Sequence, residues 1–317
     1  MNLITENPYR PYRGEALRSA VNLTHKTLSA YFPDQGLPEV VELARVLQRP
    51  LLLKGEPGSG KTCLAEAIAY EMYHDKYKDY FHAWHIKSTT KAKEGLYTFD
   101  QLRRLRDSTL KEEKDIESYV TYGPLGSAIR GSTAKAPHIV LIDEIDKADI
   151  DFPNDLLLEL DEKQFKVQET NKVYPDSKHT FYPPIIIITS NNEKELPAAF
   201  LRRCIFHYIE FPGEKVLSEI VNAKLEHELK TSLPKPLISA ILNKFQQLHD
   251  VMKDDPNVGS IPSTSSLLDW VKAVAFGVLE RKEFSPDEFV DKLKNGELPY
   301  AGVLLKTLED FDKYKGQ

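Results

Sequence analysis

An apolar stretch at residues 50–54 runs directly into the glycine-rich segment GEPGSGKT at residues 55–62, and the helical pattern CLAEAIAYEMY follows it. The apolar stretch predicts a buried strand, and the pattern behind the loop predicts a helix. Gly55 and Gly60 allow the backbone to curl, so successive N–H groups and the helix N-terminus face one point. A chance Gly/Ser turn would need neither the strand nor the helix. The segment therefore predicts a site for the phosphates of a nucleoside triphosphate.

Two side chains at the end of this loop suit phosphate and magnesium chemistry. Lys61 supplies a mobile positive charge, and the hydroxyl of Thr62 can bind a magnesium ion that bridges the phosphates. Such an ion neutralises charge that builds up as the last phosphoryl group leaves. The predicted nucleotide-binding residues are Gly55, Glu56, Pro57, Gly58, Ser59, Gly60, Lys61, Thr62 and Cys63.

The composition is that of a soluble globular protein with a full core. The chain has 317 residues, of which 41% are hydrophobic and 28% charged, and this length favours about two domains. Its net charge of −6 argues against a protein whose whole surface binds duplex DNA. Cys63 and Cys204 lie far apart and lack metal-ligand spacing, so we expect both to be reduced and packed. No signal-peptide pattern or membrane-spanning apolar run is evident, so we expect a cytoplasmic protein.

The chain changes character twice. Residues 1–49 are punctuated by proline and predict an N-terminal linker with helices at 16–31 and 38–47. Residues 50–213 alternate apolar β-branched runs with helical patterns, which is typical of buried parallel strands and their crossover helices. Residues 214–317 are helical in pattern. The predicted strands are 51–53, 138–143 and 185–189, and the predicted C-terminal helices are 214–229, 235–252, 265–279 and 302–314. We therefore predict an α/β fold, a parallel sheet sandwiched by helices, followed by a smaller helical lid domain.

The predicted strand at 138–143 ends in carboxylates. Ligands bind at the carboxyl edge of open α/β sheets, where Asp143 can hold magnesium and Glu144 can orient or deprotonate an attacking water. The alternative is an acidic turn between strand and helix with Asp146 as an N-cap. Because the phosphate loop is also present, we favour the catalytic interpretation.

The strand at 185–189 is followed by polar residues that can reach the same edge. Asn191 is our candidate for sensing the water and the terminal phosphate, with Ser190 or Asn192 as substitutes. An asparagine-rich turn is the alternative, because asparagine favours turns.

Two adjacent arginines end the segment LPAAFLRRC at residues 196–204, which predicts an apolar helix. A guanidinium inserted from the next subunit can stabilise the charge of a transferring phosphoryl group. Arg202 or Arg203 could act in this way. The alternative is an exposed pair of arginines that form salt bridges.

The order GEPGSGKT, VLIDEID, IIIITSNN and LPAAFLRRC, followed by a helical domain, resembles the AAA+ ATPases. Three segments are particularly similar to the MoxR branch: YGPLGSAI at 122–129, DEIDKADIDFPNDLLLELDE at 143–162 and TSNNEKELPAAFLRRC at 189–204. The resemblance implies a homo-oligomeric ring, usually of six subunits, that holds ATP and Mg²⁺ at each subunit interface. On that pattern Lys61, Glu144, Asn191 and Arg203 are catalytic, and Thr62 and Asp143 bind the metal.

Two segments look like insertions of this branch. Residues 164–182 predict a hairpin with a polar turn around 175–177. Residues 89–97 and a helix that carries Arg103, Arg104 and Arg106 would lie near the central channel of the ring. A solvated basic helix face explains these arginines equally well.

One feature departs from the family pattern. Many AAA+ proteins carry a second sensing arginine at the start of a lid helix, whereas residues 259–266 read GSIPSTSS and contain none. The absent arginine does not remove the residues predicted to hydrolyse ATP, but it allows slow turnover or a switch-like use of ATP.

The resemblance favours an ATP-driven, chaperone-like motor that remodels or activates a partner protein, in MoxR relatives commonly one with a von Willebrand factor A domain. Two alternatives stay open. A nucleic-acid-translocating motor would need basic residues along its channel, and the acidic balance of the chain disfavours it. An ATP-gated assembly switch with slow hydrolysis would fit the absent lid arginine.

Overall fold

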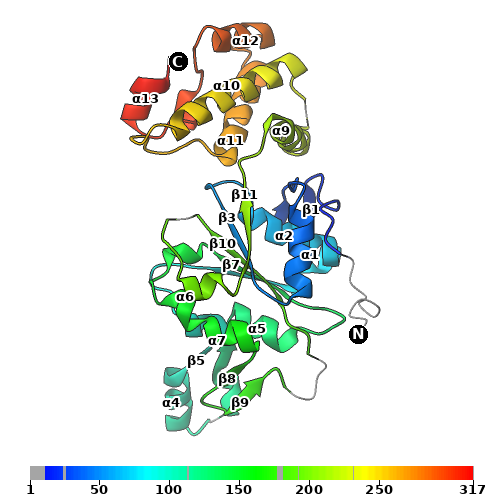
Figure 1. The fold of residues 1–317 in the computed structure, drawn as a ribbon, viewed down its shortest axis with the longest axis vertical. Coiled ribbons are helices and arrows are strands. Elements are labelled where there is room, and N and C mark those ends of the chain that lie inside the picture. The colour runs from blue at the N-terminus through cyan, green and yellow to red at the C-terminus, as the bar shows by residue number, and fades with distance from the viewer. Residues whose placement is uncertain are drawn as a thin grey trace. The chain divides into compact units, whose positions relative to one another are not determined.

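The computed structural model describes residues 11–23, 26–112, 114–176, 181–191, 193–230 and 232–316 (Figure 1). The chain forms two compact units. The core unit comprises Met1–Ala16, Pro33–Gly55 and Lys61–Ile209, and the helical unit comprises Leu17–Phe32, Glu56–Gly60 and Glu210–Gln317. This division differs from the predicted one because residues 17–32 and 56–60 group with the C-terminal helices.

A five-stranded parallel sheet forms the centre of the core unit, in the order β11-β3-β10-β7-β4. The inner strands are the three apolar runs that the sequence predicted, and their residues are almost entirely buried. The predicted parallel sheet is confirmed. Its strands are β3 (Leu51–Gly55), β4 (Phe81–His85), β7 (Ile139–Asp143), β10 (Ile185–Ser190) and β11 (Ile205–Ile209).

The two edge strands, β4 and β11, were not predicted. An edge strand has a neighbour on one side only, so its residues need not be uniformly apolar. In β11, Phe206 and Tyr208 are exposed while Ile209 is buried, and β4 includes two histidines. Neither strand therefore shows the continuous apolar run that marks β3, β7 and β10.

Helices flank the sheet. The predicted helix at 38–47 is confirmed as α1, which lies against β3 and β11, and α2 lies against β3, β7 and β10. A continuous apolar core that includes Leu52, Val140 and Ile188 fills one side of the sheet. The helices and 3-10 turns of this part are α1 (Leu37–Val46), α2 (Lys61–Tyr73), η1 (His74–Asp79), α5 (Pro124–Gly131), η3 (Ile145–Lys147), α6 (Phe152–Asp155), α7 (Leu157–Glu162) and α8 (Ala198–Leu201).

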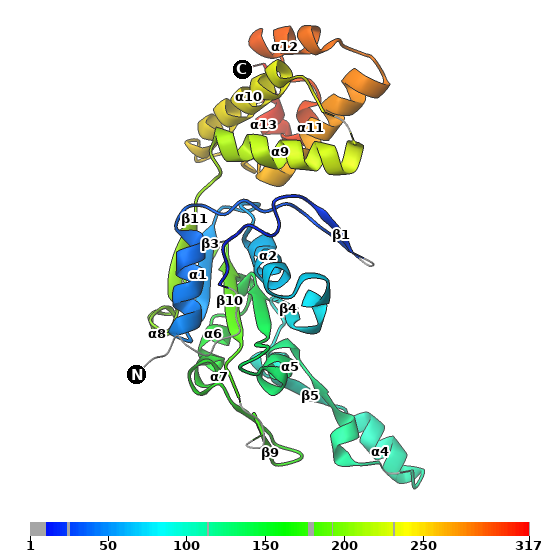
Figure 2. The ribbon, with the colours of Figure 1, turned by 90° about the vertical axis from the view of Figure 1, so that its right-hand side faces the viewer.

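Two insertions extend from one end of the core unit (Figure 2). The first is an arm in which β5 pairs with β6 and α4 carries the three predicted arginines. The second is the hairpin β8–β9. Glu117 joins them, because it accepts hydrogen bonds from Tyr122 of the arm and from Tyr174 of the hairpin, the latter at 2.8 Å. The elements are α3 (Ala92–Leu96), β5 (Tyr97–Phe99), α4 (Gln101–Thr109), η2 (Ile116–Tyr119), β6 (Val120–Tyr122), β8 (Phe165–Val167) and β9 (Lys172–Tyr174).

The hairpin has its turn earlier than predicted. Residues 168–171 connect its strands, whereas we predicted a turn around 175–177, and Ser177 lies outside the described residues. Asn171 adopts the left-handed conformation, with φ of 55°, and the Thr170 hydroxyl accepts the Lys172 N–H. Asparagine tolerates this backbone region well, which explains why the chain reverses there.

The predicted helix at 16–31 is wrong. The structure has an antiparallel hairpin here, in which β1 (Val21–Leu23) pairs with β2 (Lys26–Leu28). Val21 and Thr27 are β-branched and favour strands, and the Thr27 hydroxyl donates to the Asn22 side chain at 2.8 Å.

The C-terminal part of the helical unit is built around Trp270, Phe245 and Phe289, which are all fully buried. The predicted helices at 214–229, 235–252 and 265–279 are confirmed, the last with a π-helical end. A helix at Pro286–Lys294 was missed although Ser285 and Glu288 form a capping box before it, and the final helix is shorter than predicted because Thr307 caps it. The elements are α9 (Glu214–Leu229), α10 (Lys235–Lys253), α11 (Thr264–Ala275), η4 (Phe276–Glu280), α12 (Pro286–Lys294), η5 (Ala301–Val303) and α13 (Leu308–Tyr314).

Among the residues that the structure describes, none of the helices combines the length and the apolar character needed to cross a membrane.

Candidate active site

The glycine-rich loop between β3 and α2 curls at two glycines. Gly58 and Gly60 have positive φ angles of 76° and 90°, and the Ser59 N–H donates to the Glu56 carbonyl at 3.2 Å. Gly55 was predicted to provide part of this curl, but it is the last residue of β3 and its φ is not positive. The correct pair is therefore Gly58 and Gly60, because only their backbone needs the freedom that glycine has.

Side chains of the helical unit hold the loop residues 56–60. The carboxylate of Glu56 pairs with Lys253 at 2.6 Å and with the Nε2 atom of His249 at 3.2 Å. Burial acts to raise the pKa of Glu56, but the hydrogen bond and charge of Lys253 and the contact with His249 together lower it. A side chain at Gly58 would bring its Cβ atom within 2.6 Å of the Ser263 Cβ. The sequence did not predict these contacts, since no motif links residue 56 to residues 249 and 253.

Lys61 and Thr62 begin α2 in the core unit. Lys61 is 6% exposed, and its Nζ atom donates to the Gly55 carbonyl at 2.8 Å. The Thr62 hydroxyl donates to Oδ1 of Asp143 at 3.0 Å. The start of α2 and the end of β7 are thus brought together within the core unit. Cys63 follows on α2 and is half-buried.

The Asp143 carboxylate is buried and has three polar partners. Besides Thr62, its Oδ1 atom accepts the Thr189 hydroxyl at 2.7 Å, and its Oδ2 atom lies 3.0 Å from Nδ1 of His85. Thr189 comes from β10 and His85 from β4, and both neighbouring strands therefore orient this carboxylate. The sequence indicated Thr189 only as part of a polar strand end and gave no signal for His85.

Glu144 lies just past β7 in the left-handed region, with φ of 59°. Its backbone N–H donates to the Thr189 hydroxyl at 2.8 Å. Its side chain accepts the Asn191 amide at 3.0 Å on Oε1 and pairs with Lys147 at 2.6 Å on Oε2. Non-glycine residues adopt this backbone region at a cost, so the surrounding contacts hold Glu144 in a defined orientation. The hydrogen bond that Lys147 donates to Glu144 raises the pKa of Lys147.

Asp146 does not cap a helix, so the N-cap that the alternative interpretation assigned to it is wrong. It lies within η3, is 2% exposed, and accepts the N–H groups of Asn191 at 3.0 Å and Glu193 at 2.9 Å on Oδ2. Its carboxylate therefore holds the loop after β10 next to Glu144. Ser190 is buried at the end of β10, and Asn192 lies outside the described residues.

Arg203 does not join this group. Its Nε atom pairs with Asp161 at 2.6 Å and its Nη1 atom donates to the Ala199 carbonyl at 2.9 Å, while Arg202 is exposed. The helix before them, α8, spans only Ala198–Leu201 and is much shorter than the predicted apolar helix. Within the described residues, Arg203 has no contact with Thr62, Asp143, Glu144 or Asn191.

Cys63 lies on α2, and Cys204 lies just before β11. Cys204 is buried, and burial raises the pKa of its thiol to about 12. In the described part of the chain neither cysteine forms a disulfide, and no group of three or more His, Cys, Asp or Glu side chains there could hold a metal ion by itself. A magnesium site at Thr62 and Asp143 would therefore take its other ligands from phosphates and water, as is usual for this ion.

A family model covers the part of the chain that carries these residues. Residues 50–204 match the family model of the AAA domain, dynein-related subfamily. The parallel sheet with its flanking helices, glycine-rich loop and C-terminal helices is the AAA+ P-loop NTPase fold, and the match supports an AAA+ ATPase. The model does not distinguish the MoxR branch.

Two solved structures are similar to the chain. One is NtrX from Brucella abortus in complex with ADP, at 15% identity over 86% of this chain and 53% of that chain, with a TM-score of 0.48. The other is domain III of the Thermotoga maritima replication initiation protein DnaA, at 18% identity over 83% of this chain and 92% of that chain, with a TM-score of 0.44. The chain thus spans about half the length of the NtrX chain. None of the curated proteins matches the sequence.

Proposed function

We propose that this chain is a MoxR-like AAA+ ATPase that hydrolyses ATP at the interfaces of a homo-oligomeric ring and uses the energy to remodel or activate a partner protein. The observation that carries the hydrolytic part is the contact of Thr62 and Thr189 with one carboxylate, that of Asp143, directly beside Glu144. The start of α2, which directly follows the glycine-rich loop, and the end of β7 meet at this carboxylate.

The residues present fit a magnesium ion. The Thr62 hydroxyl and the Asp143 carboxylate are 3.0 Å apart, and both are hard oxygen donors. The ion, when bound with ATP, would neutralise charge on the phosphates. Thr189 and His85 keep the Asp143 carboxylate turned toward Thr62, so the protein needs little rearrangement to bind the metal.

Glu144 is the proposed general base. Its side chain is partly exposed, so water can reach it, and its carboxylate is held by Asn191 on one oxygen. A carboxylate in this position can accept a proton from an attacking water while the Asn191 amide orients the same water. Lys61 would move from the Gly55 carbonyl to the phosphates when nucleotide binds.

Arg203 is the proposed finger toward the neighbouring subunit. It has no role within its own site, and its partner Asp161 is exposed enough for the ion pair to exchange with a phosphate. This arrangement supports a ring, for which we propose six subunits. We also propose a protein substrate and a partner with a von Willebrand factor A domain, both on the strength of the MoxR resemblance, and a cytoplasmic location.

A mixing experiment tests the ring. Arg203→Ala and Glu144→Gln subunits should each be inactive, because each lacks half of the interface site. When the two are mixed and reassembled, an Arg203 from one variant meets a Glu144 from the other, and part of the ATPase activity should return. Mixed particles of ring size without any recovered activity would contradict action between subunits. Arg202→Ala serves as the matched control and should keep most of its activity.

A further inference from the structure

The glycine-rich loop carries a negative charge that its proposed ligand does not favour. Glu56 is the second residue of GEPGSGKT, and Lys61 is the one cationic residue of that segment. Nucleotide phosphates are anions, so an ionised carboxylate in the same loop opposes their binding. Lys61 is needed for the phosphates themselves. The charge of Glu56 therefore has to be balanced by residues from elsewhere in the chain.

Glu56 is ionised at neutral pH. Burial acts to raise its pKa, but Lys253 and His249 together lower it below the ordinary value of 4.5. The side chain of Glu56 is only 20% exposed, so water and salt screen its charge incompletely. The loop thus keeps a full negative charge beside its glycines.

Two residues of α10 contact this carboxylate. Nζ of Lys253 lies 2.6 Å from Oε1 of Glu56, and Nε2 of His249 lies 3.2 Å from Oε2. An ionised carboxylate only accepts hydrogen bonds, so Nε2 of His249 carries the hydrogen in this contact. Each oxygen of Glu56 thus accepts from a different side chain. All three residues belong to the helical unit, as do the other residues of the loop from Pro57 to Gly60.

The two partners of Glu56 differ in mobility. The His249 side chain is 2% exposed, and its ring stacks on that of Phe211 with 4.0 Å between the ring centres and 23° between the planes. Phe245 in turn stacks on Phe211 at 6.1 Å. The Lys253 side chain is 51% exposed and ends α10. His249 is therefore a fixed donor, whereas Lys253 supplies a cationic group that is held mainly by the carboxylate itself.

We propose that Lys253 is a positioning residue for nucleotide binding, whose charge neutralises Glu56 and, with His249, keeps that carboxylate paired with α10 when phosphates arrive. The inference rests on the proposed function, because it requires phosphates to bind at this loop. It also gives the helical unit an influence on the nucleotide in a chain whose residues 259–266 lack the arginine that many AAA+ proteins carry there.

A purely mechanical role is the alternative, in which the contacts of Glu56 fasten the loop and their charge is irrelevant. The two roles differ in what they predict for Glu56→Gln. That variant removes the negative charge and weakens the fastening. A mechanical role predicts weaker nucleotide binding, whereas neutralisation of charge predicts binding at least as tight as in the wild type, because Lys253 then attracts the phosphates without opposition.

The test titrates the full chain with fluorescent analogues of ATP and ADP in the presence of Mg²⁺. Lys253→Met should raise the Kd for ATP about fivefold, and that for ADP by less, because ATP brings one more negative charge to the loop. Lys253→Arg should bind both nucleotides as the wild type does. The double variant Glu56→Gln/Lys253→Met contains neither charge and should return to within about twofold of the wild-type Kd for ATP.

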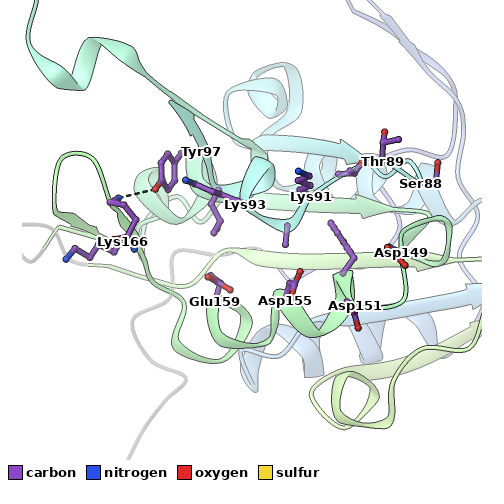
Figure 3. Close-up of a pocket in the computed structure, with 15 residues that line it drawn as sticks. Ser88, Thr89, Lys91, Lys93, Tyr97, Asp149, Asp151, Asp155, Glu159 and Lys166 are labelled. Atoms are coloured by element: carbon purple, nitrogen blue, oxygen red, sulfur yellow. Dashed lines mark hydrogen bonds between the residues drawn. The ribbon is translucent and has the colours of Figure 1, made fainter. Parts of the chain in front are cut away.

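Two exposed lysines provide matched controls for the change in net charge. Lys235→Met alters the first residue of α10, about 27 Å from Lys253 along the helix. Lys166→Met alters the core unit, where Lys166 lines a cavity at the β8–β9 hairpin (Figure 3). Both variants should bind ATP and ADP as the wild type does.

Three results would each overturn the proposal: unchanged ATP binding by Lys253→Met, an equal loss for ATP and ADP without recovery in the double variant, or weaker ATP binding by Glu56→Gln. If Lys253→Met proves too unstable to measure, Glu56→Gln alone still decides between the two roles. These results would leave the proposed function standing. A wild-type chain that binds neither nucleotide would instead refute the proposed function, and the role of Lys253 with it.

Discussion

Lys147 pairs with Glu144 across 2.6 Å, on the carboxylate oxygen that faces away from Asn191. The carboxylate of the proposed general base is therefore contacted on both oxygens. The Asn191 amide can also orient an attacking water, whereas the Lys147 ammonium group competes with that water for the carboxylate. Asn191 therefore orients the Glu144 carboxylate, whereas Lys147 reduces its capacity to accept a proton from water.

Replacing Lys147 by alanine should raise ATP turnover. The ion pair lies at the surface, where such pairs are weak, so its loss should raise the rate by up to about fivefold. Steady-state phosphate release with saturating ATP measures the effect. Lys292→Ala, which breaks the exposed pair with Glu297 in the helical unit, is the control and should leave turnover unchanged. A clear fall in the rate of the Lys147 variant would mean that the lysine helps catalysis.

Gly58→Ala should weaken nucleotide binding. The residue has a φ of 76°, and an added Cβ would meet Ser263 at 2.6 Å. Strain of this kind costs about 1 to 3 kcal/mol, which corresponds to a loss of affinity of about five- to a hundredfold if the loop changes its shape. A fluorescent ATP analogue gives the Kd. Gly213→Ala is the matched control, since nothing lies within 4 Å of its Cβ position, and wild-type affinity of both variants would refute the strain argument.

The pair formed by His82 of β4 and His138, the residue before β7, should make stability depend on pH. Nε2 of His82 lies 2.8 Å from Nδ1 of His138; burial lowers the pKa of both rings, and burial together with the charge of His82 brings that of His138 to about 4. The unfolded chain binds these protons near the ordinary pKa of 6.5. Stability is therefore complete above that pH and falls as the pH drops from about 6.5 toward 4.

Urea unfolding between about pH 7 and pH 5 checks this expectation, because the strongly lowered carboxyl pKa values of Glu117 and Asp255 act only at lower pH. His138→Gln should lose less stability over this range than the wild type. The exposed His74→Gln variant should behave like the wild type. An identical pH profile for all three proteins would rule out the buried pair as the cause.

Glu117→Gln should loosen both insertions together. Burial acts to raise the pKa of Glu117, but hydrogen bonds from Lys172, Tyr122 and Tyr174 hold it at about 2, so this stabilisation persists above pH 4.5 and is lost as the pH falls toward 2. Without the charge, amide hydrogen exchange should quicken in β6 and in β9 but not in β7. Glu112→Gln, on the same arm and exposed, is the control. Faster exchange in only one insertion would show that Glu117 does not join them.

The inner part of the fold could be predicted from the sequence because its strands are buried on both faces. Ile185–Ser190 and Ile139–Asp143 read as continuous apolar runs for that reason. β11 alternates between exposed and covered residues at the edge of the sheet, and no single-chain pattern distinguishes it from a loop. The hairpin at residues 21–28 was misread as a helix because short polar segments carry little periodicity.

Some residues of the candidate site could likewise be predicted from the sequence and others could not. Thr62 and Asp143 were predicted because the loop and the strand end each have a characteristic local pattern, and the structure joins them by a hydrogen bond. His85 was missed because its contact with Asp143 follows from strand pairing, in which residue 85 lies opposite residue 143. His249 and Lys253 were missed for a similar reason, since their partner Glu56 is almost two hundred residues away in the sequence.

We propose that Glu144 activates water for ATP hydrolysis, and the substitution Glu144→Gln removes that function alone. Glutamine has nearly the shape of glutamate, and its amide oxygen can still accept a hydrogen bond from Asn191. It cannot accept a proton from water as the carboxylate does. ATP turnover and ATP affinity should be measured together for the wild type, Glu144→Gln and the neighbouring exposed control Glu193→Gln. We expect Glu144→Gln to bind ATP as tightly as the wild type and to hydrolyse it about a hundredfold more slowly or worse. Wild-type turnover in that variant would show that Glu144 is not the general base.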